Sequence, residues 1–223
     1  MSRFALGCVL FVAILLTAAC GGGSTNTTQQ LRVVMASPDA PAVDVMINGS
    51  QVATSLQYRN STTYVPVTVH AQQVEIVEVS NSKSLFQQTV TVPASANQTL
   101  LVTGPVAHLQ GVLLTDGGAT TTTANGEVRV VNASATMGAA DVYITSGGGF
   151  AGSTPVASSL AFGQSSGYQA EAIGDYDVFM TAPGTSNVLL DTGLLALTQS
   201  QLQTVVALDA AGGGFTYIVL TDQ

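Results

Sequence analysis

Alternating apolar and polar residues dominate the chain after residue 30 and predict short β-strands. Residues 73–79 and 86–92 alternate with a period of two, as strands do when one face is in a core and the other in water. Residues 43–47 and 51–56 flank Asn48-Gly49, a dipeptide that suits the positive φ angles of a tight hairpin. Residues 195–202 are compatible with a single turn of helix. The pattern predicts an all-β fold built as an antiparallel β-sandwich.

The chain contains an internal repeat, which indicates two copies of one domain. Arg32-Val-Val-Met-Ala-Ser37 recurs as Arg129-Val-Val-Asn-Ala-Ser134, and Asp44-Val45 recurs as Asp141-Val142, both at an offset of 97 residues. The offset then grows, mainly because the second copy has extra residues at 146–154. Three later landmarks also recur: Ser61-Thr-Thr-Tyr64 as Ser165-Ser-Gly-Tyr168, Gln98-Thr-Leu-Leu101 as Gln203-Thr-Val-Val206, and Leu113-Leu-Thr-Asp116 as Val219-Leu-Thr-Asp222.

Composition shifts divide the chain into five parts. We expect a signal peptide at 1–19, a lipidated cysteine with a flexible tether at 20–30, and the first sandwich repeat at 31–115. A Gly/Thr-rich linker follows at 116–126, and the second repeat occupies 127–223. The tether has no apolar residue after the cysteine, and a flexible segment of about ten residues reaches roughly 17 Å. The two domains are therefore expected close to a membrane.

Two segments resemble motifs of a known family. Ser37-Pro-Asp-Ala-Pro-Ala-Val-Asp-Val45 is similar to the opening motif of the domain-of-unknown-function family 4397, and Gly174-Asp-Tyr-Asp-Val178 resembles its later Gly-x-Tyr-x-Val segment. The second copy has Ala135-Thr-Met-Gly138 in place of Pro-Asp-Ala-Pro, and the first has no clean Gly-x-Tyr. The resemblance implies tandem Ig-like sandwiches on secreted or surface bacterial proteins, and it implies no enzymatic activity.

The N-terminus has the three parts of a signal peptide. Arg3 supplies the positive start, an apolar run covers 4–16, and small residues lead to Cys20. The ending resembles the lipobox of bacterial lipoproteins, with Thr17 where that motif prefers leucine. The resemblance implies cleavage before Cys20 and its lipidation, and two or three acyl chains hold a protein durably on a membrane.

Two alternatives to lipidation stay open, an uncleaved membrane anchor and ordinary signal cleavage that leaves a free thiol. Gly21 follows the cysteine where, by enterobacterial analogy, an aspartate would favour the inner membrane. We therefore expect a cell-envelope protein, at the outer rather than the inner membrane. Cys8 and Cys20 are the only cysteines, so the mature domains have no disulfide.

The charge balance excludes some partners. Without Arg3 the chain has four basic and thirteen acidic residues, a net charge of about −9. Nucleic-acid binding depends on clustered Lys and Arg, so we predict no nucleic-acid partner. The remaining expected partners are the membrane, through the lipid anchor, and a glycan or an envelope protein; the sequence leaves the oligomeric state open.

The sequence offers little catalytic or metal-binding chemistry. Gly163-Gln-Ser-Ser-Gly167 fits the Gly-x-Ser-x-Gly pattern of hydrolases, but no helix is predicted after Ser165, and His70 and His108 both precede it. Two histidines make no metal cluster, and Asp175 with Asp177 lacks the loop spacing of a calcium site. We predict no enzyme, no metal and no cofactor.

The most informative polar pattern is an arginine twelve residues before an aspartate, once in each copy. Arg32 precedes Asp44, and Arg129 precedes Asp141. Our hypothesis is a structural ion pair within each copy that fixes the register of its first two strands; two unrelated strand-edge residues are the alternative.

Three functions remain from the sequence alone. The preferred one is a membrane-anchored, non-catalytic binding or structural module whose ligand is unknown. The second is an accessory subunit of an envelope assembly, and the third is an envelope hydrolase, which the histidine count disfavours.

Overall fold

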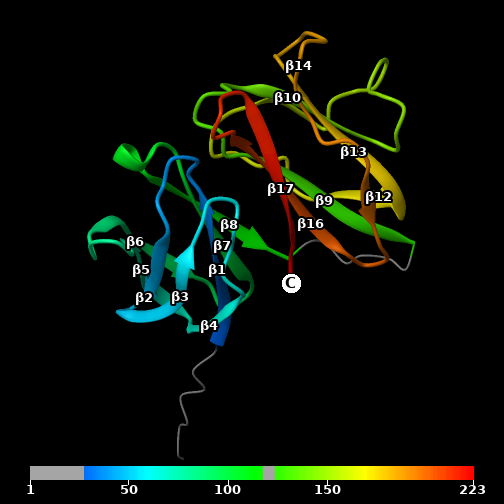
Figure 1. Cartoon of the computed structure of the whole chain (residues 1–223). Helices are drawn as coiled ribbons and strands as arrows, with labels where there is room; N and C mark the ends of the chain where they lie inside the picture. Colours follow the sequence, from blue (N-terminus) through cyan, green and yellow to red (C-terminus); the bar gives the residue numbers. More distant parts are fainter. Residues whose placement is uncertain (1–27, 118–123) are drawn as a thin grey trace, which may run out of the picture.

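The computed structural model describes residues 28–117 and 124–223, which form two β-sandwiches (Figure 1). The expected signal peptide, Cys20 and most of the tether lie outside these residues, as does the centre of the expected linker. Among the described residues, no helix has the length and apolar character needed to cross a bilayer.

The first repeat has eight strands and one short 3-10 helix. One sheet has the order β4-β1-β7-β8 and the other the order β3-β2-β5-β6. The elements are β1 (Thr28–Ala36), β2 (Val43–Ile47), β3 (Ser50–Leu56), β4 (Val65–Thr68), β5 (His70–Glu78), β6 (Ser84–Val92), β7 (Asn97–Thr103), η1 (Val106–His108) and β8 (Gln110–Asp116). The hairpin expected at Asn48-Gly49 is confirmed, since both residues have positive φ angles and join β2 to β3.

The second repeat follows the same plan. Its sheets have the orders β12-β9-β16-β17 and β11-β10-β13-β14, and β15 pairs with β13. The strands are β9 (Asn125–Asn132), β10 (Ala140–Thr145), β11 (Ala157–Leu160), β12 (Gln169–Ala172), β13 (Gly174–Thr181), β14 (Val188–Asp191), β15 (Leu195–Leu197), β16 (Leu202–Asp209) and β17 (Phe215–Thr221). The helical turn considered at 195–202 is wrong, because its first three residues pair with β13 as a strand.

The all-β sandwich prediction is confirmed, although the sheets are not purely antiparallel. β1 runs parallel to β7, and β9 runs parallel to β16. Each of these pairs is separated in sequence by the whole opposite sheet, so the chain returns in the same direction. The strands also extend past the expected domain limits: β1 begins at Thr28, inside the expected tether, and β8 includes Asp116, expected in the linker.

Three apolar cores arrange the four sheets as four layers. One core lies between the two sheets of the first repeat and another between those of the second. The third joins the repeats, because the sheets that contain β1 and β9 pack face to face. These two middle sheets are visible side by side in Figure 1, with β7 and β8 of one facing β16 and β17 of the other. The third core consists of Val34, Ala36, Leu101, Leu114, Val131, Ala133, Val206, Leu208, Ile218 and Leu220.

The middle strands are buried on both faces, and their sequences explain why. In β1, the residues at 31, 33 and 35 face the first core, whereas Val34 and Ala36 face the other repeat. Strands buried on both sides have nearly continuous apolar runs instead of alternating ones. Arg32 belongs to the face turned toward the other repeat, and it is 5% exposed.

Candidate functional site

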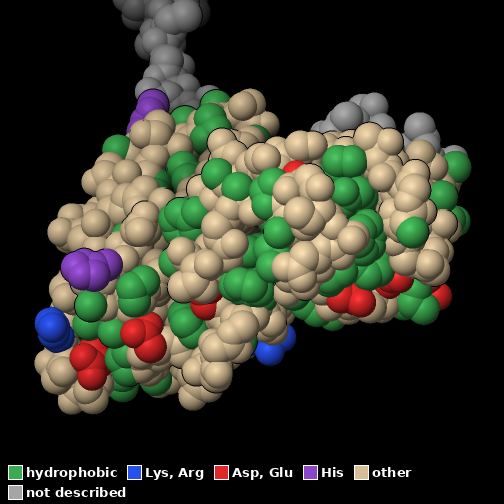
Figure 2. Space-filling model, turned by 90° about the horizontal axis from the view of Figure 1, so that it is seen from above, with side chains coloured by type: hydrophobic (Ala, Val, Ile, Leu, Met, Phe, Trp, Pro, Cys, Tyr) green, Lys and Arg blue, Asp and Glu red, His purple; other side chains and the backbone are tan. Residues whose placement is uncertain are grey.

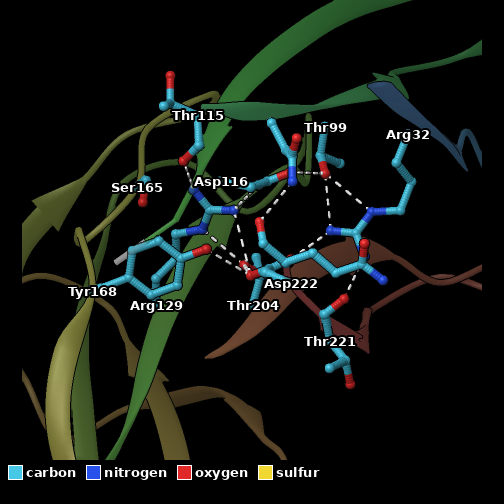
Figure 3. A network of polar contacts seen from close by, with 12 residues as sticks. Arg32, Thr99, Thr115, Asp116, Arg129, Ser165, Tyr168, Thr204, Thr221 and Asp222 are labelled. Atoms are coloured by element: carbon cyan, nitrogen blue, oxygen red, sulfur yellow. Dashed lines mark hydrogen bonds and ion pairs between the residues drawn. The ribbon is translucent and has the colours of Figure 1, made fainter. Parts of the chain in front are cut away.

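A buried polar cluster lies between the two repeats and is centred on two arginines (Figure 3). Arg32 comes from β1 of the first repeat, and its Nη2 donates to Oδ1 of Asp222 in the second repeat at 2.5 Å. Its Nη1 donates to the carbonyl oxygen of Thr221 at 2.8 Å, and both Nε and Nη2 donate to Oγ1 of Thr99. One arginine therefore connects its own sheet with the last strand of the other repeat.

Arg129 repeats these contacts in the opposite direction. Its Nη2 donates to Oδ1 of Asp116 at 2.5 Å, and its Nη1 donates to the carbonyl of Thr115 at 2.7 Å. Its Nε donates to Oγ1 of Thr204 at 2.7 Å. Each repeat thus gives its arginine to the other repeat and receives one in return. The two ion pairs also touch, because Arg129 Nη2 lies 3.6 Å from Oδ2 of Asp222.

Two tyrosines complete the cluster. The hydroxyl of Tyr64 donates to Oδ2 of Asp116 at 2.8 Å, and that of Tyr168 donates to Oδ2 of Asp222 at 2.7 Å. Each ring also lies against the arginine of its own repeat, with the guanidinium carbon 4.5 Å from the ring centre. A cation over an aromatic face is attracted by the ring quadrupole.

Burial fixes the protonation of these tyrosines. It raises the pKa of Tyr64, and the charge of Asp116 raises it further. Burial also raises the pKa of Tyr168, although Arg129 opposes this effect. Both hydroxyls therefore stay protonated well into the alkaline range and donate to the carboxylates. The side chains of Asp116 and Asp222 are 0% exposed, so each charge depends on its protein partners, which also include the hydroxyls of Thr99 for Asp116 and Thr204 for Asp222.

The expected pairing within each copy is wrong. Arg32 pairs with Asp222 and not with Asp44, and Arg129 pairs with Asp116 and not with Asp141. Arg32 points toward the neighbouring repeat, whereas Asp44 lies on β2 in the outer sheet and accepts from a backbone amide there. The two groups thus belong to different layers.

The repeated aspartates have a shared structural role. Asp44 accepts from the N–H of Ser55 at 3.0 Å, and Asp141 accepts from the N–H of Ser159 at 2.8 Å. Both serines have a φ of 51°, and they lie where the strand register shifts. At such a bulge one amide drops out of the sheet ladder, and the carboxylate satisfies it.

Six residues of the cluster were not predicted from the sequence, although a signal was present: Tyr64, Thr99, Asp116, Tyr168, Thr204 and Asp222. All six belong to the landmarks that recur in both copies. The mainly apolar segments at 31–36 and 128–133, which do not alternate with a period of two, indicate burial on both faces. Together these patterns point to a repeated polar cluster inside a buried interface.

Other contacts surround the cluster and close the interface. The hydroxyl of Tyr58 donates to the carbonyl of Asp209, and Thr103 Oγ1 donates to the carbonyl of Ala133 at 2.6 Å. Arg59, which is exposed, donates to the carbonyl of Tyr217 at 2.9 Å. The repeats are therefore joined by an apolar core, a central ionic cluster and a peripheral set of hydrogen bonds.

The Gly-x-Ser-x-Gly segment is a structural loop. Ser165 Oγ accepts from the N–H of Gly167, while Ser166 Oγ accepts from the N–H of Val130. In the first repeat, Thr62 accepts from the N–H of Val33 in the same way. The strand that follows, β12, pairs with β9, so Ser165 is not at a strand-to-helix turn. The segment therefore attaches a loop to the first strand of the second repeat, and the loop that contains Thr62 is attached in the same way in the first repeat.

The described residues contain no group of three or more His, Cys, Asp or Glu side chains that could hold a metal ion. His70 begins β5 and His108 ends η1, both in the first repeat, whereas Ser165 is in the second. Cys20 lies outside the described residues, so its lipidation stays a prediction.

Three solved structures that resemble the chain are distant likenesses. The chain is similar to the family 26 carbohydrate-binding modules of Eubacterium rectale Amy13K, solved with maltoheptaose, at 10% identity and a TM-score of 0.29, over 85% of this chain and 96% of that one. It is similar to a streptococcal virulence factor that binds alpha-glucan, at 7% identity and a TM-score of 0.28, over 78% and 92%. A candidate cell adhesion protein from Bacteroides fragilis has 9% identity and a TM-score of 0.26, over 87% and 98%. Likenesses this low carry no argument about ligands.

Among curated proteins no sequence matches this chain. The sequence profile of one family, described as a domain of unknown function, matches twice, at residues 29–143 and 126–223. The two matches overlap at 126–143 and together cover almost all of the described residues, which is consistent with a tandem arrangement and confirms the resemblance noted in the motifs. The chain belongs to the DUF4397 family.

Proposed function

We propose that this protein is a membrane-anchored, non-catalytic envelope lipoprotein whose two repeats act as one rigid body that presents its outer surfaces for binding. The observation that carries the proposal is the reciprocal Arg–Asp cluster. Both of its carboxylates are fully buried, and each is paired with an arginine from the other repeat. Separating the repeats would also expose the apolar residues of the third core to water, so the two repeats stay together.

The aspartates and serines that the sequence singled out have structural contacts. The aspartates at 116 and 222 hold the interface, those at 44 and 141 satisfy amides at bulges, and Ser165 and Ser166 fasten a loop. A nucleophilic serine needs a nearby base to activate it. The only two histidines of the chain lie in the other repeat, which supports a non-catalytic role.

The N-terminal sequence supports the anchor. Arg3, the apolar run and Cys20 match the signal and lipidation pattern, and β1 begins only eight residues after that cysteine. A membrane anchor at Cys20 would hold the first repeat close to the bilayer, with the second repeat fixed to it through the interface. In Figure 1, the start of β1 and the turn between β13 and β14 lie at opposite extremes of the described residues.

The surface agrees with an uncharged partner better than with a charged one. On the face shown in Figure 2, Lys and Arg side chains are few, and hydrophobic side chains are scattered among uncharged polar groups. Only 8% of the residues in the chain are charged. A glycan or a polar envelope protein fits this surface, and the anionic backbone of nucleic acid does not.

The test measures two properties, lipidation at Cys20 and binding to envelope material. Intact mass of the membrane-extracted protein should show a mature chain that begins at Cys20 and carries acyl chains, and Cys20→Ala should release it from membranes. A secreted Cys20→Ala form should still bind purified envelope material. Unmodified mass, or no retention on envelope material, would contradict the proposal. A stoichiometric protein partner after pull-down would favour the accessory-subunit function instead.

A further inference from the structure

The second repeat has an open cavity that the interface does not use. It lies on the outer sheet, between the loop at 146–154 and the turn at 182–187, and its volume is about 460 Å³. That volume is within the range of roughly 300–1,000 Å³ that is usual for small-molecule sites. The functional groups in its lining come from Asp141, Tyr143, Phe150, Ser153, Thr185 and Ser186.

Aromatic packing holds one wall of the cavity in place. Phe150 belongs to the loop, and Tyr143 and Phe179 lie on the outer face of the sheet. The centre of the Phe150 ring is 4.8 Å from the ring centre of Tyr143 and 5.1 Å from that of Phe179. The N–H of Ser153 also donates to the carbonyl of Phe150 at 2.9 Å. Aromatic pairs at these distances are attractive, so the loop has a defined position over the sheet.

Asp141 holds the other wall. Its Oδ2 accepts from the N–H of Gly184 at 2.7 Å, which draws the turn at 182–187 toward β10. Gly184 has a φ of 68°, and Thr185 donates to the carbonyl of Ala182 to close the turn. Thr181, directly opposite Asp141 in the sheet, has a fully buried hydroxyl with no partner among the described residues.

The first repeat has no counterpart of this loop. Its second and third strands are joined by Asn48 and Gly49 alone, and Asp44 has no second bond like that of Asp141 to Gly184. A sandwich of this kind therefore forms without the extra residues at 146–154. They form a loop that covers part of the outer sheet of the second repeat, and three glycines of this loop, at 147, 148 and 149, have positive φ angles.

The chemistry of the lining selects an uncharged, hydroxyl-rich ligand. The lining residues include no lysine or arginine. Asp177 and Asp191 lie on the same sheet face as Phe179, so anions are repelled. Three hydroxyl side chains and one carboxylate accompany two aromatic rings, the combination that can hydrogen-bond and stack a sugar ring.

We propose that this cavity binds a neutral saccharide, as a single ring or a short chain end. The proposal rests on the binding role proposed above and gives it a site. Asp141 does not offer a free carboxylate to a cationic ligand, because both of its oxygens already accept a backbone N–H. Ser153 and Ser186 are exposed on the rim, where their hydroxyls can reach a ligand.

The experiment measures binding of neutral oligosaccharides of glucose, galactose, mannose and N-acetylglucosamine to the detergent-solubilised full chain by calorimetry. At least one should bind with a Kd of about 10 µM to 1 mM. Ser153→Trp fills the cavity from an exposed position and should weaken that binding by about tenfold or more. Thr91→Trp, on an exposed strand position of the first repeat, is the matched control and should leave it unchanged.

A second variant removes the cavity without adding bulk. Replacing 146–154 with the Asn-Gly turn of the first repeat should abolish saccharide binding while the thermal transition stays cooperative. The proposal is overturned if no neutral saccharide binds, if Ser153→Trp binds as well as Thr91→Trp, or if choline or a lysine-rich peptide binds the cavity instead. Retention on envelope material distinguishes failure of the saccharide site from failure of the proposed function. If retention persists in Ser153→Trp while saccharides fail, the site is refuted and the proposed function stands.

Discussion

Replacing Arg32 with methionine should destabilise the protein by about 3 kcal/mol, at the lower end of the roughly 3–5 kcal/mol found when one partner of a buried ion pair is removed. The variant keeps the apolar stem and loses four hydrogen bonds, two to Thr99 and one each to Thr221 and Asp222. It also leaves the Asp222 carboxylate buried with one full charge. The lower value applies because Arg129 remains 3.6 Å away and Tyr168 still donates to that carboxylate.

Urea unfolding followed by circular dichroism measures this loss, and calorimetry should show a fall of roughly 6–12 °C in Tm, at about 2–4 °C per kcal/mol for a chain of this size. Arg59→Met is the matched control, since Arg59 also crosses the interface but is exposed and donates only to the Tyr217 carbonyl. It should cost less than about 1 kcal/mol. Equal losses in the two variants would refute the reasoning.

A double variant tests the cause of the loss. If the cost of Arg32→Met comes from an uncompensated carboxylate, adding Asp222→Asn should recover part of the lost stability. Further loss on adding Asp222→Asn would show that the carboxylate is satisfied by its other partners, and that the arginine acts through packing.

Three further predictions follow from the same contacts. Tyr168→Phe removes one donor to the buried Asp222 carboxylate and should cost about 1–3 kcal/mol by urea unfolding, whereas Tyr143→Phe, at a half-buried tyrosine of the outer sheet, should change little. Burial raises the pKa of Asp177, and the charges of Asp191 and Asp175 raise it further, so the ionised form of Asp177 disfavours folding. Asp177→Asn should therefore stabilise the protein at pH 7. The gain in stability should shrink as the pH falls toward 3.8, the ordinary pKa of an aspartate. A gain that is the same at pH 3.5 and pH 7 would contradict that assignment. Residues 124–223 alone should self-associate in sedimentation experiments. Without the first repeat they expose one face that bears apolar side chains and charged ones: Val131, Val206, Ile218, Arg129 and Asp222. A monodisperse monomer would show that this face needs no partner.

Sequence patterns predict the outer sheets more completely than the middle ones. The alternation at 73–79 and 86–92 and the turn at Asn48-Gly49 correspond directly to β5, β6 and the β2–β3 hairpin. The apolar runs of β1, β7, β9 and β16 contain the information that these strands are buried on both faces, yet they do not say what covers the second face. Only the assembled layers show that the cover is the other repeat.

The polar cluster was harder to predict for a related reason. A residue repeated in two copies can contact its own copy or the other, and the spacing of Arg32 and Asp44 is the same in either case. The two middle sheets meet face to face, so equivalent residues are exchanged between repeats, and Arg32 finds Asp222 instead of Asp116. The cavity was beyond sequence reasoning because it depends on how Phe150 folds back onto Tyr143 and Phe179.

The stacking of four sheets also determines what the protein can touch at one time. Because the middle sheets cover each other, the two outer sheets look in opposite directions, and the faces that bear Asp44 and Asp141 are back to back. A flat surface can therefore meet only one of them. If both faces are used, the molecule must sit between two different surfaces as a fixed-width bridge, with a thickness set by the two sandwiches and without a hinge at their junction.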